Sequence, residues 1–165
     1  MKQTFAIVIG AGAWDSNPDE MPAEKGIYFV YRCKTMTDKN GKLILDDKNR
    51  PKKFLDKLLY IGESGDARER MKDHNRDDDV RTSDIPKSES LYYTFAEYNG
   101  SDDNRRRIEA ALIYKHRKVL PDGVGNTKNT KTFDYDETTI KISGEYTDCL
   151  TKEFTQERVK MPEKP

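Results

Sequence analysis

Three short runs of apolar and aromatic residues constrain the fold of this chain more than any other feature. They are GIYFVYR at 26–32, LLYIG at 58–62 and LYYTFAEY at 91–98. Runs of this length that are rich in Tyr, Phe, Ile and Val are typical of buried strands. A further apolar run at 4–9 predicts an N-terminal strand that ends at the glycines of GAGAW. The chain is therefore expected to fold around a β-sheet.

Two helices are expected between and after these strands. Asp66 can cap the first helix, which runs through ARERMKDHNR, and SDDN offers N-caps for a second helix through RRRIEAALIYKHRKVL. The second helix should end near Pro121 and Gly123. TTIKIS and EYTDCLTKEF form either two more short strands or a strand and a turn. We therefore expect a mixed α/β (α+β) fold with a small, mostly antiparallel three-stranded sheet flanked by helices. Its core order is β-β-α-β-α, preceded by the N-terminal strand and followed by a short C-terminal extension.

Composition narrows the class of protein. The 165 residues suit one domain, 34% of them are hydrophobic and 36% charged, and the formal net charge is zero. Cys33 and Cys149 lie far apart, which argues against a zinc site or a disulfide framework and favours free thiols in a cytoplasmic protein. The run FAIVI is too short for a signal peptide, and no segment approaches the roughly 20 apolar residues that a membrane helix needs. No internal repeat is evident.

Several polar residues occupy positions that invite a chemical interpretation. Arg70 and His74 are four residues apart on the first helix and so share one face. Glu109 shares a largely apolar face of the second helix with Leu112 and His116, and a carboxylate there either pairs with a cation or binds a metal. A local pair with the arginine four residues earlier is the simpler alternative. His116 is expected to be a cation favoured by the helix C-terminus, and single tyrosines in strands are usually core residues.

Taken together, these residues resemble the GIY-YIG nuclease family. The resemblance rests on Gly26-Ile27-Tyr28, Tyr60-Ile61-Gly62, Arg70 and His74, and it continues through Glu109 and Asn126. It implies a catalytic core at about 24–128 within a single domain at 1–165, with extensions at 1–23 and 129–165. The two tripeptides are separated by 31 residues, more than in compact members of the family. An inserted hairpin is therefore implied, and the Asn40-Gly41 pair marks its turn.

The resemblance implies a metal-dependent endonuclease that hydrolyses phosphodiester bonds of DNA. Glu109 would hold one Mg²⁺ or Mn²⁺, with Arg70 on a phosphate oxygen. Either Tyr28 or His74 would be the general base, and the sequence leaves both open because a free tyrosine has a pKa of about 10. Tyr60 would orient the water or the phosphate, and Asn126 would brace the site.

Local charge fits a nucleic-acid partner better than the zero net charge does. Residues 31–57 hold nine Lys or Arg against four Asp or Glu, and residues 101–120 hold six against three. The expected contacts to DNA, most simply double-stranded DNA, are Lys42, Arg105, Arg106, Lys115 and Lys128. Solvated helix and loop faces are the alternative explanation of these charges. An inactive nucleic-acid-binding or protein-interaction module of the same fold, and a nuclease for RNA or branched DNA, are the alternative functions. The chain would act as a monomer or a homodimer.

Overall fold

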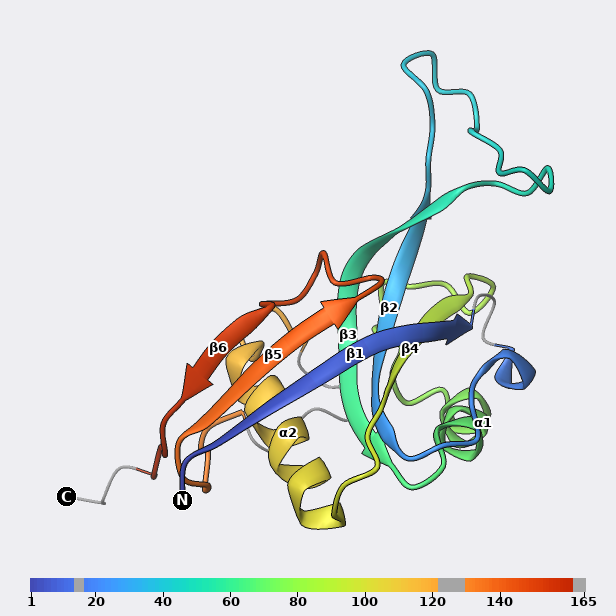
Figure 1. Ribbon diagram of the computed structural model, residues 1–165. Helices are drawn as coiled ribbons and strands as arrows, with labels where there is room; N and C mark the ends of the chain where they lie inside the picture. The colour runs from blue at the N-terminus through green and yellow to red at the C-terminus, as the bar shows by residue number, and fades with distance from the viewer. Residues whose placement is uncertain (14–16, 122–129, 162–165) are drawn as a thin grey trace.

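A computed structural model describes residues 1–13, 17–121 and 130–161 of the chain, and it shows an α+β fold built on one curled sheet (Figure 1). The elements in chain order are β1 (Gln3–Ala13), a short 3-10 helix η2 (Pro18–Glu20), β2 (Gly26–Thr35), β3 (Lys53–Ser64), α1 (Ala67–Asp77), β4 (Leu91–Glu97), α2 (Asp102–Lys115), β5 (Thr138–Gly144) and β6 (Glu153–Gln156). From β2 to α2 the order is strand, strand, helix, strand, helix. The three aromatic runs form β2, β3 and β4, as their composition predicts.

The prediction of a three-stranded sheet is wrong. The sheet has six strands in the order β3-β2-β4-β1-β5-β6, and it is mixed because β1 pairs with β5 in parallel while the other neighbours are antiparallel. β1 also does not end at its glycines. It continues to Ala13 through an irregularity between Ile9 and Gly12, and this places Gly12 against the Tyr92 ring.

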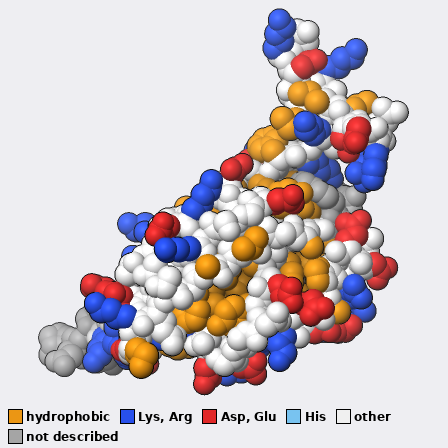
Figure 2. All heavy atoms as spheres, viewed as in Figure 1, with side chains coloured by type: hydrophobic (Ala, Val, Ile, Leu, Met, Phe, Trp, Pro, Cys, Tyr) orange, Lys and Arg blue, Asp and Glu red, His pale blue; other side chains and the backbone are white. Residues whose placement is uncertain are grey.

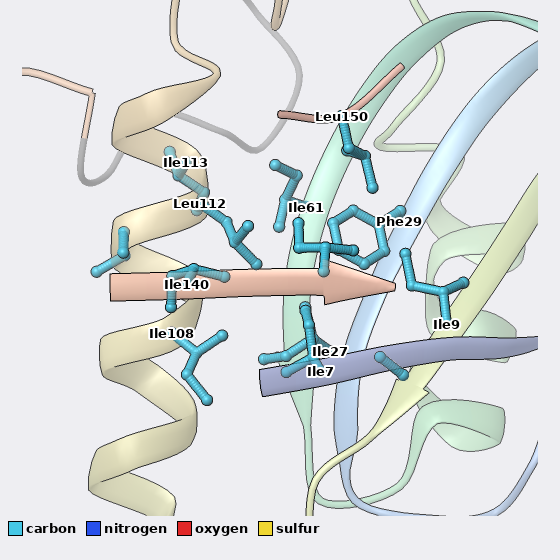
Figure 3. Close-up of a cluster of buried hydrophobic side chains, with 14 of the residues drawn as sticks. Ile7, Ile9, Ile27, Phe29, Ile61, Ile108, Leu112, Ile113, Ile140 and Leu150 are labelled. Atoms are coloured by element: carbon cyan, nitrogen blue, oxygen red, sulfur yellow. The ribbon is translucent and has the colours of Figure 1, made fainter. Parts of the chain in front are cut away.

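Two hydrophobic cores lie on opposite faces of the sheet, because successive residues of a strand point to opposite sides. In β2 the side chains of Ile27, Phe29 and Tyr31 join the core under α2, whereas Tyr28 and Val30 join the core under α1. Figure 3 shows the α2 core, in which Ile108 and Leu112 of the helix meet isoleucines of the curled sheet. The inner strands β2 and β4 are covered on both faces, which explains why their sequences are apolar almost without interruption.

The helix ends follow local capping signals. The Asp66 carboxylate accepts from the Glu69 N–H at 3.0 Å, and the Ser101 hydroxyl oxygen accepts from the Asn104 N–H at 3.1 Å. α1 ends at Asp78, which adopts the left-handed conformation with φ of 48°. That turn reverses the chain direction and brings the following residue back toward the helix.

Neither helix in the described part of the chain is long and apolar enough to cross a membrane. Both cysteines are free; Cys33 is buried and Cys149 is half-buried.

His116 is buried and neutral rather than a cation at the end of α2, so that part of the sequence interpretation is wrong. Its Nδ1–H donates to the Leu112 carbonyl oxygen at 2.8 Å, and its Nε2 accepts from the Thr151 N–H at 3.0 Å. A carbonyl only accepts and a backbone N–H only donates, so these bonds fix the neutral tautomer. Burial, assisted by Lys115, lowers the pKa of His116 below its usual 6.5, against the Leu112 bond that raises it.

We expect the fold to lose stability at acid pH through this residue. Because the folded-state pKa is depressed, the unfolded chain binds the proton first, so stability is full above about pH 6.5 and falls as the pH drops toward the folded pKa. Replacing His116 by Gln should weaken this loss, by about 1.4 kcal/mol for each pKa unit of depression. The measurement is urea unfolding at pH ~7.5 and pH ~5 for both proteins. An identical acid-induced loss in the two proteins would contradict it.

Candidate active site

Tyr28 and Tyr60 lie side by side on the face of the sheet that carries α1. Tyr28 is in β2 and Tyr60 in the edge strand β3, and their rings stack with centroids 5.9 Å apart. Tyr28 is the cross-strand partner of Gly62, and a Cβ atom at Gly62 would lie 2.3 Å from Cζ of Tyr28. Bare backbone is therefore required where the tyrosine ring crosses β3. Gly26 meets a similar restriction, because its Cβ would lie 2.2 Å from the Ala96 carbonyl oxygen.

His74 connects this pair of tyrosines to α1. Its Nε2 lies 2.8 Å from the Tyr28 hydroxyl, and its ring packs edge-on against Tyr60 at 4.9 Å between centroids. Its Nδ1 lies 2.6 Å from Oδ1 of Asp79. With Asp79 ionised, Nδ1–H donates to the carboxylate, which leaves Nε2 as the acceptor of the Tyr28 O–H. The three side chains form a directed chain of hydrogen bonds from the tyrosine to the carboxylate.

Asp79 is the one residue of this hydrogen-bonded series that the sequence analysis did not single out. It follows the end of α1, and the left-handed Asp78 turns the backbone so that Asp79 reaches His74 five residues earlier. The acidic triplet at 77–79 has the composition of a polar loop. That loop is anchored instead by buried Val80 and Ile85. A carboxylate just beyond the C-terminus of a helix that carries a histidine was the available signal.

Burial sets the protonation states in this cluster. It lowers the pKa of His74 below 6.5; Asp79 opposes that shift and Arg70 adds to it, so the ring is neutral at pH 7. Burial also raises the pKa of Tyr28 well above 10. Tyr60 adds to that increase, and Arg70 opposes it. Tyr28 is therefore a neutral hydrogen-bond donor with a neutral acceptor behind it.

Arg70 lies at the open side of the cluster. It is one turn before His74 on α1, its side chain is 41% exposed, and it lies 3.8 Å from Asp73. Its guanidinium also interacts with the hydroxyls of Tyr28 and Tyr60. Tyr28 is buried and Tyr60 is half-buried, so Arg70 and Tyr60 are accessible at the site, beside the carboxylates of Asp73 and Asp79. The guanidinium of Arg70 is the group there that suits an anionic oxygen.

Glu109 is not in this cluster. It is buried on α2, which packs on the other face of the sheet. Arg105, its neighbour one turn earlier, forms ion pairs with Glu63 of β3 and with Asp102. Arg105 is buried, so its side chain does not suit the expected contact with DNA.

The edge strand β3 lies between the two groups of residues. The side chain of Tyr60 points toward α1, whereas those of Ile61 and Glu63 point toward α2. Within residues 1–13, 17–121 and 130–161, no three His, Cys, Asp or Glu side chains are grouped so that they could hold a metal ion alone. A metal at Glu109 would thus need oxygen ligands from beyond such a group, such as water or phosphate.

The remaining residues that were expected to contact DNA lie on α2, between β2 and β3, or outside the described residues. Arg106 is exposed and lies 3.8 Å from Asp103, and Lys115 lies 5.7 Å from the centroid of the Phe154 ring. Lys42 is exposed in the segment between β2 and β3. Lys128 lies outside the described residues, and so does Asn126, which was expected to brace the catalytic site. Arg107, which completes the RRR run, donates to Thr138, Gln3 and backbone oxygens near the N-terminus, so it serves the fold.

Comparisons of the chain with models of protein families, with curated proteins and with solved structures found no match. The functional interpretation therefore rests on the site itself.

The close approach of Tyr28 to Gly62 gives a direct test of the geometry. Replacing Gly62 by Ala should force the Tyr28 ring off β3 and away from His74, and should destabilise the fold by about 1–3 kcal/mol, as overpacking does. The measurement is the free energy of unfolding in urea. Gly65→Ala is the matched control, since a Cβ there meets nothing within 4 Å. Its effect should stay within about 0.5 kcal/mol, and an equal effect of the two changes would contradict the geometry.

Proposed function

We propose that the protein is a metal-dependent endonuclease of the GIY-YIG type that cleaves DNA. The observation that carries the proposal is the chain of hydrogen bonds from Tyr28 through His74 to Asp79, with Arg70 and Tyr60 at its open side. Four residues that the motif resemblance selects are together in space, although they come from β2, β3 and α1. Hydrolysis of a phosphodiester needs an activated water and a cation at phosphorus, and this cluster supplies groups for both.

The geometry supports a proton relay instead of a choice between Tyr28 and His74 as the base. The raised pKa of Tyr28 opposes a free tyrosinate, but its O–H already points to His74 Nε2. As a water attacks phosphorus, its proton passes to the Tyr28 oxygen while the Tyr28 proton passes to Nε2. The Asp79 carboxylate stabilises the imidazolium that results. No net charge develops on the buried tyrosine at any stage.

Arg70 and Tyr60 act on the phosphate side. A planar guanidinium at the opening can donate two parallel hydrogen bonds to non-bridging phosphate oxygens, and their negative charge increases as the water attacks. The stacked Tyr60 holds the Tyr28 ring in register and presents its own hydroxyl to the same space. Together they orient the phosphorus over the hydroxyl of Tyr28.

Glu109 is the residue that would hold the metal. A buried carboxylate on α2 is the kind of single oxygen ligand that Mg²⁺ uses together with substrate phosphates and water. When bound, the ion would supply Lewis-acid stabilisation of the leaving 3′ oxygen, provided that the DNA strand passes the edge strand β3, because Glu109 and the tyrosine cluster lie on opposite sides of that strand. Because this protein ligand is a single carboxylate, affinity for the metal should be low until DNA is present.

The exposure of Arg70 is compatible with an extended substrate. The cleft of about 250 Å³ beside His74 is lined also by Asn75, Arg81 and Tyr93, and Arg70 is not part of its lining. The side chain of Arg70 is 41% exposed. A nucleic-acid strand that presents one phosphate to Arg70 does not need to be enclosed.

The main test is cleavage of plasmid and oligonucleotide DNA with Mg²⁺, Mn²⁺ or EDTA. The parent should cut only with metal. Tyr28→Phe and Arg70→Ala should each lower the rate about 100-fold or more, because each removes one group from the transition state. Glu109→Gln should abolish the metal-dependent rate.

Arg76→Ala is the matched control for Arg70→Ala, since it removes an exposed arginine from the same helix, and it should cut like the parent. Binding without cutting in the parent would contradict the proposal and favour an inactive module. Faster cutting of RNA or branched DNA than of duplex DNA would keep the chemistry and change the substrate.

A second test uses the pH dependence of cleavage. His74 must be neutral to accept the proton, so the rate should fall as the pH drops through its pKa, which lies below 6.5. Asp79 raises that pKa, so Asp79→Asn should move this acid limb to lower pH while lowering the maximal rate about tenfold or more. The measurement is the single-turnover rate from pH ~5 to pH ~8. A uniform loss of rate with an unmoved acid limb would mean that Asp79 acts only on stability.

A further inference from the structure

The segment between β2 and β3 forms a forked arm that projects from the body of the protein (Figure 1). We use "the arm" for residues 36–52, "the first prong" for residues 37–43 and "the second prong" for residues 45–51. A bridge between Thr37 and Leu43 closes the first prong, and one between Leu45 and Pro51 closes the second. The inserted hairpin expected from the sequence is thus two hairpins on one stem.

The two prongs repeat one hydrogen-bonding plan. In the first, the Asp38 carboxylate accepts from the N–H groups of Asn40 and Lys42, and the Gly41 N–H donates to the Asp38 carbonyl oxygen. The same bonds recur in the second prong, eight residues later. The Asp46 carboxylate accepts from the N–H groups of Lys48 and Arg50, and the Asn49 N–H donates to the Asp46 carbonyl oxygen. The fourth position of each plan is left-handed, with φ of 79° at Gly41 and 59° at Asn49.

Three backbone hydrogen bonds join the prongs to the stem in a closed cycle. The Met36 N–H donates to the Lys52 carbonyl oxygen, the Ile44 N–H to that of Met36, and the Lys52 N–H to that of Ile44, at 2.7, 3.0 and 2.8 Å. These three residues are spaced by eight. The chain therefore contains an eight-residue repeat that the sequence analysis did not recognise, because the aspartate is the main feature that the two units share. Bonding of this density holds the prongs in a defined relation to each other.

The arm is positively charged and carries exposed apolar side chains. Lys39 and Lys42 lie on the first prong and Lys48 and Arg50 on the second. The carboxylates of Asp38 and Asp46 accept from backbone N–H groups, and that of Asp46 also accepts from the Arg50 guanidinium at 3.2 Å. Leu43 and Leu45, on either side of the junction residue, are 51% and 50% exposed. Figure 2 shows Lys and Arg side chains at the end of the projection and apolar ones along it.

The stem connects the arm to the face of the active site. Alternate residues of β2 point to one face, so Tyr28, Arg32 and Lys34 follow one another on the α1 side at about 3.3 Å per residue, or ~20 Å from first to last. A groove of about 510 Å³ at the stem is lined by Arg32, Lys34, Lys53 and the segment 88–90. Arg32 donates to Glu89 of that segment and Lys34 lies 3.5 Å from Asp56, so the cations along the stem are paired with carboxylates.

We propose that the arm binds the phosphate backbone of duplex DNA on one side of the scissile phosphate, an inference that rests on the proposed nuclease function. At about 3.4 Å per phosphate along a strand, the ~20 Å path reaches about six nucleotides from the site. A fork with cations on both prongs presents charge to both edges of a groove, and the leucines at its base present apolar surface to sugars and base edges.

Two features of the arm favour duplex DNA over other partners. Single strands are usually bound by stacking on aromatic side chains, and residues 36–52 contain no Phe, Tyr, Trp or His. The arm carries more Lys and Arg than Asp, so the arms of two copies would repel each other. A polyanion such as DNA attracts the positive charge of the arm, so this repulsion does not arise.

The test replaces Lys39, Lys42, Lys48 and Arg50 together by Gln. A matched control replaces four exposed lysines near the opposite edge of the sheet: Lys2, Lys141, Lys152 and Lys160. Binding to a duplex of about 30 base pairs, long enough to extend several nucleotides past the site on each side, is measured in EDTA over a salt series. The arm variant should bind at least about tenfold more weakly, and the slope of log K against log salt should fall by about 0.9 for each phosphate that the arm no longer neutralises. The control should bind like the parent.

The outcomes separate the two proposals. If the parent cuts DNA and the arm variant binds with unchanged affinity and slope, the arm proposal is overturned and the nuclease stands. If the parent binds through the arm and never cuts, the nuclease is overturned and DNA binding by the arm stands. If the parent neither binds nor cuts, both are overturned. A change of molecular mass on sedimentation in the arm variant alone would overturn DNA as the partner in favour of a second copy of the chain. Equal thermal midpoints of parent and variant exclude unfolding as the cause.

Discussion

The hydrogen bond between the Tyr28 hydroxyl and His74 is the contact on which the candidate site depends. It joins β2 to α1 across 46 residues of chain, and it exists only because three local conditions hold together. Gly62 leaves room for the tyrosine ring over β3. Burial keeps the imidazole neutral, and Asp79 selects the tautomer in which Nε2 accepts. Each condition comes from a different part of the fold, so the site is a property of the assembled sheet and helix and not of any one motif.

Much of the fold was predictable because its signals are local. Aromatic runs specify β2, β3 and β4, and Asp66 and Ser101 cap the helices through bonds that span three residues. The size of the sheet was not predictable in this way. β1 reaches β5 through parallel pairing of residues more than a hundred positions apart, and no short window of sequence carries that information. The same holds for His116, whose charge state depends on a partner at Thr151.

The site residues show the same division. The order of Tyr28, Tyr60, Arg70 and His74 in the sequence predicted a cluster, and the structure brings these four together. Spacing on one helix could not tell which arginines face solvent. Arg105 and Arg107 turn inward toward acceptors on β3 and β5, whereas Arg106 between them stays exposed. Burial of an arginine depends on partners that are distant in the sequence, so three consecutive arginines cannot be told apart from the sequence alone.

The cyclic junction at the base of the arm has a consequence for how the sequence of such a protein can evolve. Its three bonds use only backbone groups, and each prong needs only an aspartate near its start and a residue that tolerates positive φ at the fourth position of its turn. The backbone bonds of the prongs require no other side chain. Side chains of the prongs can therefore be exchanged without disturbing the sheet that carries the candidate site, in the way that variable loops are exchanged on a constant framework. A stable core and a segment with exchangeable side chains are thus separated within a single short chain.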